Sequence, residues 1–151
     1  MTLHDKPERA TGGLVLPGEG RQLRAGPTRP TVKVGPHSGS QLLGLLESEV
    51  PPGAGFPGHV HDEYEEAFYV LDGTIEYLLD DTWITATTGS TVFVPAGRVH
   101  GFRNSGDVPC RHLAIASPAA AMSMIEELFE NEPNNMAPVL AKYRSHLAEP
   151  K

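Results

Sequence analysis

The sequence predicts an all-β fold, an antiparallel β-barrel or jelly roll, followed by an α-helical C-terminal extension. Short apolar or alternating segments recur at even spacing between residues 31 and 117, and turn residues separate them. Beyond residue 117, apolar residues recur three and four positions apart, which is the spacing of one helix face. These two patterns divide the chain into an N-terminal arm (1–30), a β-barrel (31–117) and a helical extension (118–151).

The strands are predicted from apolar segments bounded by turns. The arm is rich in Gly and Pro and is expected to be extended, with a short strand at residues 13–16. Residues 50–58 hold three prolines and are expected to form a loop, whereas Asp72-Gly73 is a strong hairpin signal. The remaining strands are expected at residues 31–34, 41–50, 67–71, 74–79, 83–86, 91–94, 100–103 and 111–117.

The extension is expected to hold two helices. Ser117 and Pro118 are a good N-cap and first helical residue, and either Asn134 or Asn135 is expected to cap the second helix. We expect both helices to pack on the outside of the barrel or on a partner subunit. Their apolar faces comprise Met122, Ile125, Leu128 and Phe129 in the first helix, and Val139, Leu140, Tyr143 and Leu147 in the second.

Composition narrows the possible partners. A chain of 151 residues is the size of one domain with a real core. A formal net charge of −7 argues against nucleic-acid binding, and no apolar run is long enough to suggest a membrane segment. Cys110 is the only cysteine, which excludes an intrachain disulfide and a thiolate metal cluster. Residues 1–13 lack the apolar stretch of a signal peptide, so a cytoplasmic protein is expected.

Three histidines and one glutamate in two short stretches make a candidate metal site. His59 and His61 lie two residues apart, so in a strand they share one face, and Glu66 follows after a short irregular segment. In the second stretch Pro95 and Gly97 turn the chain, which leaves His100 near the start of a returning strand. Three imidazoles and one carboxylate are a ligand set for a single divalent ion.

Both stretches resemble the two sequence motifs of the cupin superfamily, G-x5-H-x-H-x4-E-x6-G and G-x5-P-x-G-x2-H-x3-N. This resemblance implies a cupin jelly roll with a metal ion bound at the mouth of the barrel. Among cupins, the chain resembles the small quercetinase-like dioxygenases. Glu65 competes with Glu66 as the carboxylate ligand, but the spacing to the motif glycine favours Glu66. The matching residues are Gly53, His59, His61, Glu66 and Gly73, then Gly89, Pro95, Gly97, His100 and Asn104.

The predicted ligand set suits a divalent transition ion, namely Fe, Mn, Ni, Co, Cu or Zn. Four protein ligands leave coordination positions open for substrate, water or dioxygen, which is typical of a catalytic site. Glu66 is expected to act as the catalytic residue as well, by accepting a proton from the substrate.

Aromatic residues in and beside the motif strands are candidates for a substrate pocket, although each of them is also a candidate for the barrel core. Together they favour an aromatic or apolar small molecule. Tyr64, Arg98 and His112 are candidates to contact the metal-ligand side chains and hold them in place. The pocket candidates are Phe56, Phe68, Phe93, Phe102 and Tyr64.

The resemblance implies a location for chemistry and leaves several reactions open. The leading hypothesis is a metal-dependent dioxygenase that acts on an enolisable aromatic or flavonol-like molecule, with dioxygen as co-substrate. The second is a redox-neutral isomerase or polyketide cyclase, and the third is a non-catalytic small-molecule-binding protein. Resemblance to cupins that pair through barrel edges and N-terminal arms implies a homodimer.

Overall fold

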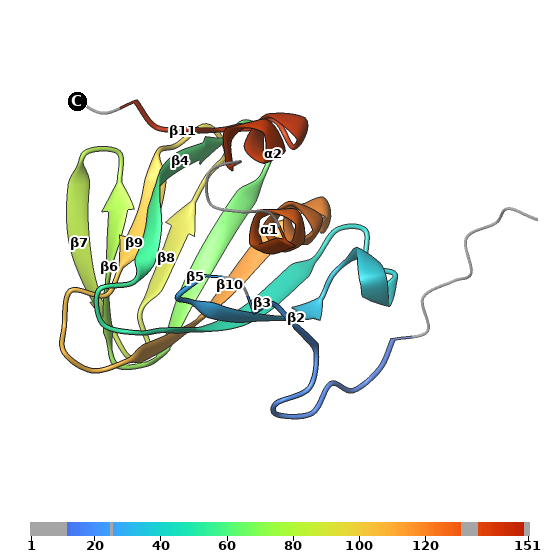
Figure 1. Cartoon of the computed structure of the whole chain (residues 1–151), viewed down its shortest axis with the longest axis horizontal. Helices are drawn as coiled ribbons and strands as arrows, with labels where there is room; N and C mark the ends of the chain where they lie inside the picture. Colours follow the sequence, from blue (N-terminus) through green and yellow to red (C-terminus); the bar gives the residue numbers. More distant parts are fainter. Residues whose placement is uncertain (1–11, 25, 131–135, 150–151) are drawn as a thin grey trace, which may run out of the picture.

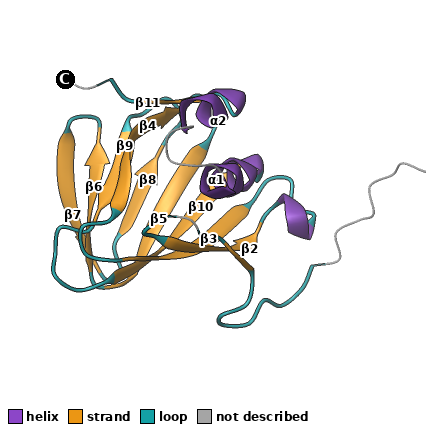
Figure 2. Cartoon of the chain, viewed as in Figure 1, coloured by secondary structure: helices purple, strands orange, loops and turns teal. Residues whose placement is uncertain are grey.

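The structure, a computed structural model, describes residues 12–24, 26–130 and 136–149. Two antiparallel β-sheets face one another, and the helices lie along one side (Figures 1 and 2). The predicted all-β jelly roll with short C-terminal helices is therefore confirmed. The six-stranded sheet has the order β1 (Arg21–Gln22), β2 (Arg29–Val34), β3 (Gly44–Val50), β10 (Cys110–Ser117), β5 (Glu65–Asp72) and β8 (Thr91–Val94). The five-stranded sheet has the order β11 (Ser145–Leu147), β4 (Gly55–His61), β9 (His100–Arg103), β6 (Thr74–Leu79) and β7 (Thr82–Thr87).

Alternation along the strands sorts residues between the core and the outer faces. In β10 every second residue is buried, beginning at Cys110, while Leu113 and Ile115 on the other face are half-buried. Val70 of β5 and Ile75 of β6 add to the same core. Because this period is two residues, the register of each strand decides which side chains reach the interior.

Glycine and asparagine set turns at the ends of the strands in both motifs. Gly73 joins β5 to β6 with φ 85°, and Gly97 precedes β9 with φ 82°, in the left-handed region that favours glycine. Asn104 follows β9 and is buried, and its amide nitrogen donates to the carbonyl oxygens of Val50 and Val108 at 2.9 and 2.8 Å. This side chain therefore closes the end of the barrel.

Two helices connect the two sheets on one side of the molecule. Helix α1 (Ala120–Glu130) packs against β3 and β10, whereas α2 (Met136–Lys142) packs against α1 and β11. A Cβ at Gly44 would lie only 2.7 Å from Cγ of Met122, so glycine allows α1 to approach β3 closely. A short 3-10 helix, η1 (Pro36–Ser38), contacts α1 as well.

Several local predictions differ from the structure. Residues 13–16 form no strand, and the segment expected to be a loop already belongs to β4 from Gly55 onward. Leu147 lies in β11, since the second helix ends at Lys142. The proposed caps Asn134 and Asn135 lie outside the described residues.

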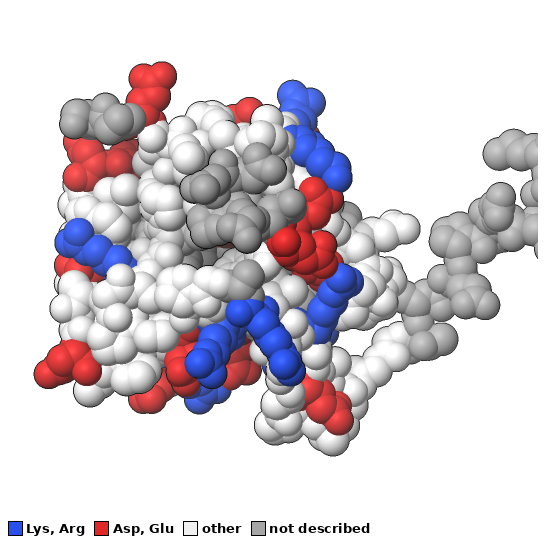
Figure 3. Space-filling view, in the orientation of Figure 1, with Lys and Arg blue, Asp and Glu red and all other residues white. Residues whose placement is uncertain are grey.

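The described surface carries interspersed charges. Lys and Arg side chains alternate with Asp and Glu around the edge of the face shown in Figure 3, and uncharged residues occupy much of its centre. Within residues 12–24, 26–130 and 136–149, no helix is long and apolar enough to cross a membrane.

Replacing Asn104 by Ala is expected to lower the free energy of unfolding by about 2–4 kcal/mol, because two carbonyl oxygens at a buried position lose their donor. Urea denaturation measures the change. Asp107→Ala, at a nearby exposed turn position, serves as the control and is expected to change stability by less than about 0.5 kcal/mol. Equal effects of the two substitutions would contradict this account of Asn104.

Candidate metal centre

Strand pairing brings the three predicted histidines together. His59 of β4 and His100 of β9 are directly opposite in the antiparallel ladder, with ring centroids 4.1 Å apart. His61 lies two residues along β4 on the same inward face, 4.7 Å from the ring of His59 and 4.9 Å from that of His100. All three side chains are buried.

The carboxylate comes from the opposite sheet. Oε2 of Glu66 in β5 lies 2.7 Å from Nε2 of His100 and 3.6 Å from Nε2 of His61. Glu65, its competitor in the sequence, faces solvent because neighbouring residues in a strand point to opposite sides. The backbone N–H of Gly97 donates to the carbonyl oxygen of His61 at 2.8 Å, which ties the turn before His100 to the end of β4.

Each histidine is oriented by a partner on its Nδ1. His59 donates from Nδ1 to the carbonyl oxygen of Pro57 at 2.8 Å, and His100 donates likewise to that of Arg98 at 3.0 Å. Nδ1 of His61 lies 2.7 Å from the hydroxyl of Ser145, which itself donates to the carbonyl oxygen of Tyr143. The Ser145 oxygen therefore accepts from His61, and all three rings direct Nε2 to the centre.

This arrangement fits a divalent metal ion. The four candidate ligand atoms of His59, His61, Glu66 and His100 lie within 4.8 Å of one another, and all four residues are buried. Histidines that bind a metal through one ring nitrogen usually donate from the other to a fixed acceptor. A divalent ion bound there would be held by these four residues and would take the place of the proton that lies between Nε2 of His100 and Oε2 of Glu66, which are 2.7 Å apart.

Burial and mutual contacts shift the pKa values of these groups. Burial, together with the nearby rings of His100 and His61, lowers the pKa of His59 to about 3. Burial alone raises the pKa of Glu66, but the hydrogen bonds from His100 and His61 outweigh it and hold this pKa below its ordinary range. At neutral pH the centre thus offers a neutral imidazole at His59 and an ionised carboxylate at Glu66.

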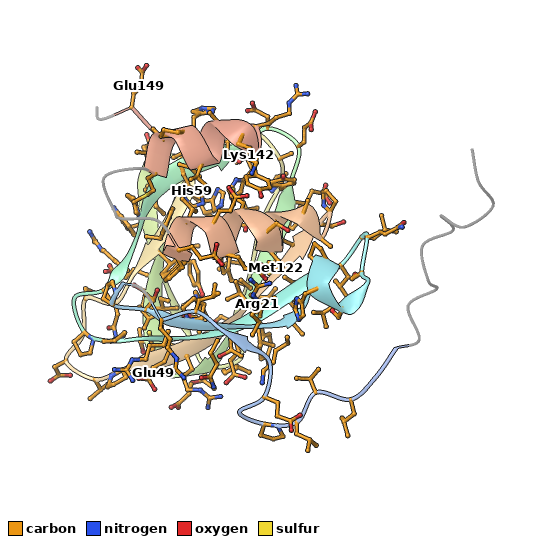
Figure 4. All side chains as sticks on the ribbon, turned by 45° about the vertical axis from the view of Figure 1, so that its right-hand side comes forward. Arg21, Glu49, His59, Met122, Lys142 and Glu149 are labelled. Carbon is orange, nitrogen blue, oxygen red and sulfur yellow. The ribbon has the colours of Figure 1, made fainter. Side chains whose placement is uncertain are left out.

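The centre opens into a pocket of about 630 Å³, including its mouth, and the pocket wall is mainly apolar. Both sheets and both C-terminal helices contribute to it. In Figure 4 His59 appears between α1 and α2. The helical residues that line the pocket are Met124, Ile125, Leu128 and Phe129 of α1 and Leu140 of α2.

The predicted pocket residues fall into two groups. Phe56, Phe68 and Phe102 line the pocket beside the four candidate ligands. Phe93 is 58% exposed on the outer face of β8, because its neighbours Val92 and Val94 take the inward positions there. Tyr64 is buried, with its ring centroid 5.6 Å from that of His61, but it is not among the residues that line the pocket.

The remaining candidates, Arg98 and His112, lie in different places relative to the pocket. Arg98 is exposed and pairs with Asp80, so it lies outside the pocket. His112 is buried in β10 and lines the pocket.

Ser145 was not predicted, because its contact with His61 joins positions 84 residues apart and no local pattern marks it. The apolar stripe of α1 was recognised, although only as core or interface.

Comparison with known proteins agrees with this geometry. Residues 46–116 match the model of the cupin domain family. The structure resembles that of an RmlC-like cupin from Shewanella frigidimarina with a TM-score of 0.64 and 18% identity, over 74% of this chain and 95% of that one. The chain therefore contains a cupin domain and has the cupin fold.

Curated relatives include enzymes of different kinds. The chain is 31% identical to quercetin 2,3-dioxygenase of Bacillus subtilis over 103 residues, which cover 68% of this chain and 31% of the relative. It is 33% identical to the polyketide synthase CurC of Streptomyces cyaneus over 89 residues, which cover 59% of this chain and 55% of the relative. The match thus spans less than two thirds of each of these relatives.

The metal-free protein is expected to lose stability as the pH falls, partly through His112. Burial lowers the pKa of this residue from 6.5 to about 4 in the folded protein, so the unfolded chain binds more protons between these values. The free energy of unfolding should therefore fall by about 2 kcal/mol between pH 7 and pH 5 from this residue. Urea denaturation at both pH values measures the loss.

The double variant Tyr77→Phe/His112→Phe is the comparison for this pH effect, since it removes the imidazole together with its hydrogen-bond partner. Between pH 7 and pH 5, the free energy of unfolding of the double variant is expected to fall by about 2 kcal/mol less than that of the wild type, because the contribution of His112 is absent. Parallel stability profiles for the two proteins would show that the pKa of His112 is not lowered by folding.

Proposed function

We propose that this protein is a metal-dependent cupin dioxygenase that acts on an enolisable aromatic or flavonol-like small molecule. The observation that carries the proposal is the opening of four converging ligand atoms into a pocket with an aromatic and apolar wall. Such a pocket suits a flat apolar molecule that carries a few oxygen atoms. The 31% identity to a quercetin 2,3-dioxygenase supports the same reaction class.

In this proposal His59, His61, Glu66 and His100 hold one divalent ion, which is Fe, Mn, Ni, Co, Cu or Zn. When bound, such an ion supplies Lewis acidity and, for every candidate except Zn, redox chemistry. The carbonyl oxygens of Pro57 and Arg98 and the hydroxyl of Ser145 keep the Nε2 atoms directed to the ion.

Glu66 has a second task, the acceptance of a proton from the substrate. Its Oε2 contacts His100 and His61, whereas its Oε1 has no hydrogen bond within the described part of the chain. Because Glu66 lines the pocket and its pKa is lowered, the carboxylate is ionised at neutral pH. Oε1 is therefore available to take the proton of a substrate hydroxyl.

The helices limit the access of water to this chemistry. Ile125 and Phe129 of α1 and Leu140 of α2 contribute to the pocket wall, and the bonds of Glu127 with Lys142 and Tyr143 join the α1 helix to the end of α2. A dry pocket strengthens the electrostatic contacts inside it and protects reactive species from hydrolysis.

A redox-neutral cyclisation or isomerisation is the second candidate. The 33% identity to the polyketide synthase CurC favours it, and the same carboxylate would then move protons on a substrate without any use of dioxygen. The two candidates differ in their need for oxygen and in the ions that support them.

Oxygen uptake tests the proposal. Metal-free protein is reconstituted separately with Fe, Mn, Ni, Co, Cu and Zn, and oxygen consumption is followed with quercetin and other enolisable aromatics. We expect consumption with at least one of the redox-active ions and none with Zn. Glu66→Gln is expected to lower turnover at least about 100-fold while the protein still binds quercetin.

Two results of this assay would contradict the dioxygenase proposal. One is the absence of oxygen consumption with all five redox-active ions. The other is conversion of a substrate at the same rate with and without air, which would support the redox-neutral candidate.

Replacing Ser145 by Ala is expected to weaken metal binding roughly 10- to 100-fold, because His61 loses the acceptor that orients its ring. Competition with a chromophoric chelator measures the affinity for Zn²⁺. Ser105→Ala, on an exposed segment after β9, is the matched control and should leave the affinity unchanged. An unchanged affinity in Ser145→Ala would show that this hydroxyl does not support the site.

A further inference from the structure

The pocket has a second polar end, away from the four candidate metal ligands. His112 of β10 and Ser48 of β3 are directly opposite in the antiparallel ladder, and both are buried and line the pocket. The ring of Phe68 lies near both ends, with its centroid 5.5 Å from that of His112 and 6.4 Å from that of His100. An aromatic surface therefore joins the two polar ends.

His112 is held firmly in an aromatic cage. Its ring stacks on Phe68 and meets the ring of Phe102 edge-on, with the centroids 4.8 Å apart. Nδ1 of His112 lies 2.7 Å from the hydroxyl oxygen of Tyr77, which is buried as well. Burial keeps the imidazole neutral at neutral pH, since its pKa is lowered to about 4. The ring thus has a fixed position and carries one proton.

The bond to Tyr77 decides where that proton is. Within the described residues the Tyr77 hydroxyl has no other hydrogen-bond partner, and a buried O–H without an acceptor is costly. Tyr77 therefore donates to Nδ1 of His112. A neutral imidazole that accepts at Nδ1 carries its proton on Nε2, so Nε2 is a hydrogen-bond donor.

This Nε2–H group faces the pocket. Nε2 forms no hydrogen bond with any described residue. Among the described residues, Oε1 of Glu126 is the one side-chain nitrogen or oxygen that is fully buried and has no hydrogen-bond partner, so Nε2 of His112 is not fully buried. A role limited to packing against Tyr77 does not need this second nitrogen, since a phenylalanine pair would fill the same space.

We propose that His112 is a substrate-positioning residue whose Nε2–H donates a hydrogen bond to an acceptor oxygen of the ligand. This inference rests on the proposed function, because it places the reacting end of the same ligand at His59, His61, Glu66 and His100. The ligand class that fits is a flat aromatic molecule with an enolisable oxygen at one end and a phenolic or carbonyl oxygen at the other. The apolar wall between them includes Phe68 and Phe102.

The test compares two flavonols that differ in their remote hydroxyls. Quercetin carries phenolic hydroxyls away from its enolisable end, whereas 3-hydroxyflavone has the same enolisable end and lacks them. Zn²⁺-loaded protein is titrated with each compound without air, and binding is followed by fluorescence. We expect quercetin to bind about tenfold more tightly than 3-hydroxyflavone. The assay needs no turnover, so a failure of the dioxygenase proposal is detected separately by oxygen uptake.

Two variants assign this preference to His112. Tyr77→Phe/His112→Phe removes both polar partners and leaves no orphaned hydroxyl, and it should reduce the quercetin preference to about twofold or less. Ser105→Ala, on the exposed segment after β9 and outside the pocket lining, is the control and should keep the tenfold preference. The Zn²⁺ content of all proteins is measured, and it should be unchanged in both variants.

Three outcomes of the binding titrations would overturn the inference. They are a failure of quercetin to bind to the wild type, a preference that persists in the double variant, and a preference that is lost equally in the control Ser105→Ala. Histidine ¹⁵N NMR of the wild-type protein gives an independent readout, which does not depend on the folding of any variant. It should show His112 as the Nε2-protonated form, and the Nδ1-protonated form would also overturn the inference.

Discussion

The pairing of β4 with β9 is the constraint on which the rest of the site depends. It places His59 opposite His100, and the alternation of β4 adds His61 on the same face. Glu66 completes the set from the other sheet, so the centre forms only when the two sheets have packed against each other. The contact between the Gly97 amide and the His61 carbonyl fixes the relative position of the two motifs.

Much of this arrangement could be predicted from the sequence because it follows local rules. The motif residues specify turns and strand faces, and the predicted bounds of β6, β8 and β9 agree with the observed Thr74–Leu79, Thr91–Val94 and His100–Arg103. The choice of Glu66 over Glu65 is also consistent with the structure, in which one faces the pocket and the other faces solvent.

The remaining features depend on contacts between distant parts of the chain. Phe93 and Phe68 look alike in the sequence, but the register of their strands sends one to solvent and the other to the pocket. Ser145 and Leu147 belong to a strand that exists only because it pairs with β4. Periodicity identified the apolar face of α1, but it does not say that this face covers a pocket.

The pocket combines features that follow local sequence rules with features that depend on contacts between distant parts of the chain. Its inner end is built by the motif strands, while its outer wall comes from the C-terminal segment, which lies beyond the matched cupin domain of residues 46–116. The pocket is therefore built partly by the matched domain and partly by a segment outside it. In this chain, His112 in β10 lies where the strand core meets the helical wall.

A crystal structure of the metal-loaded protein, with anomalous diffraction data at the absorption edge of the ion, tests the central claim most directly. We predict one anomalous peak within about 2.0–2.3 Å of Nε2 of His59, His61 and His100 and of a carboxylate oxygen of Glu66. A peak bonded to Nδ1 of these histidines, or located away from the four side chains, would contradict the account.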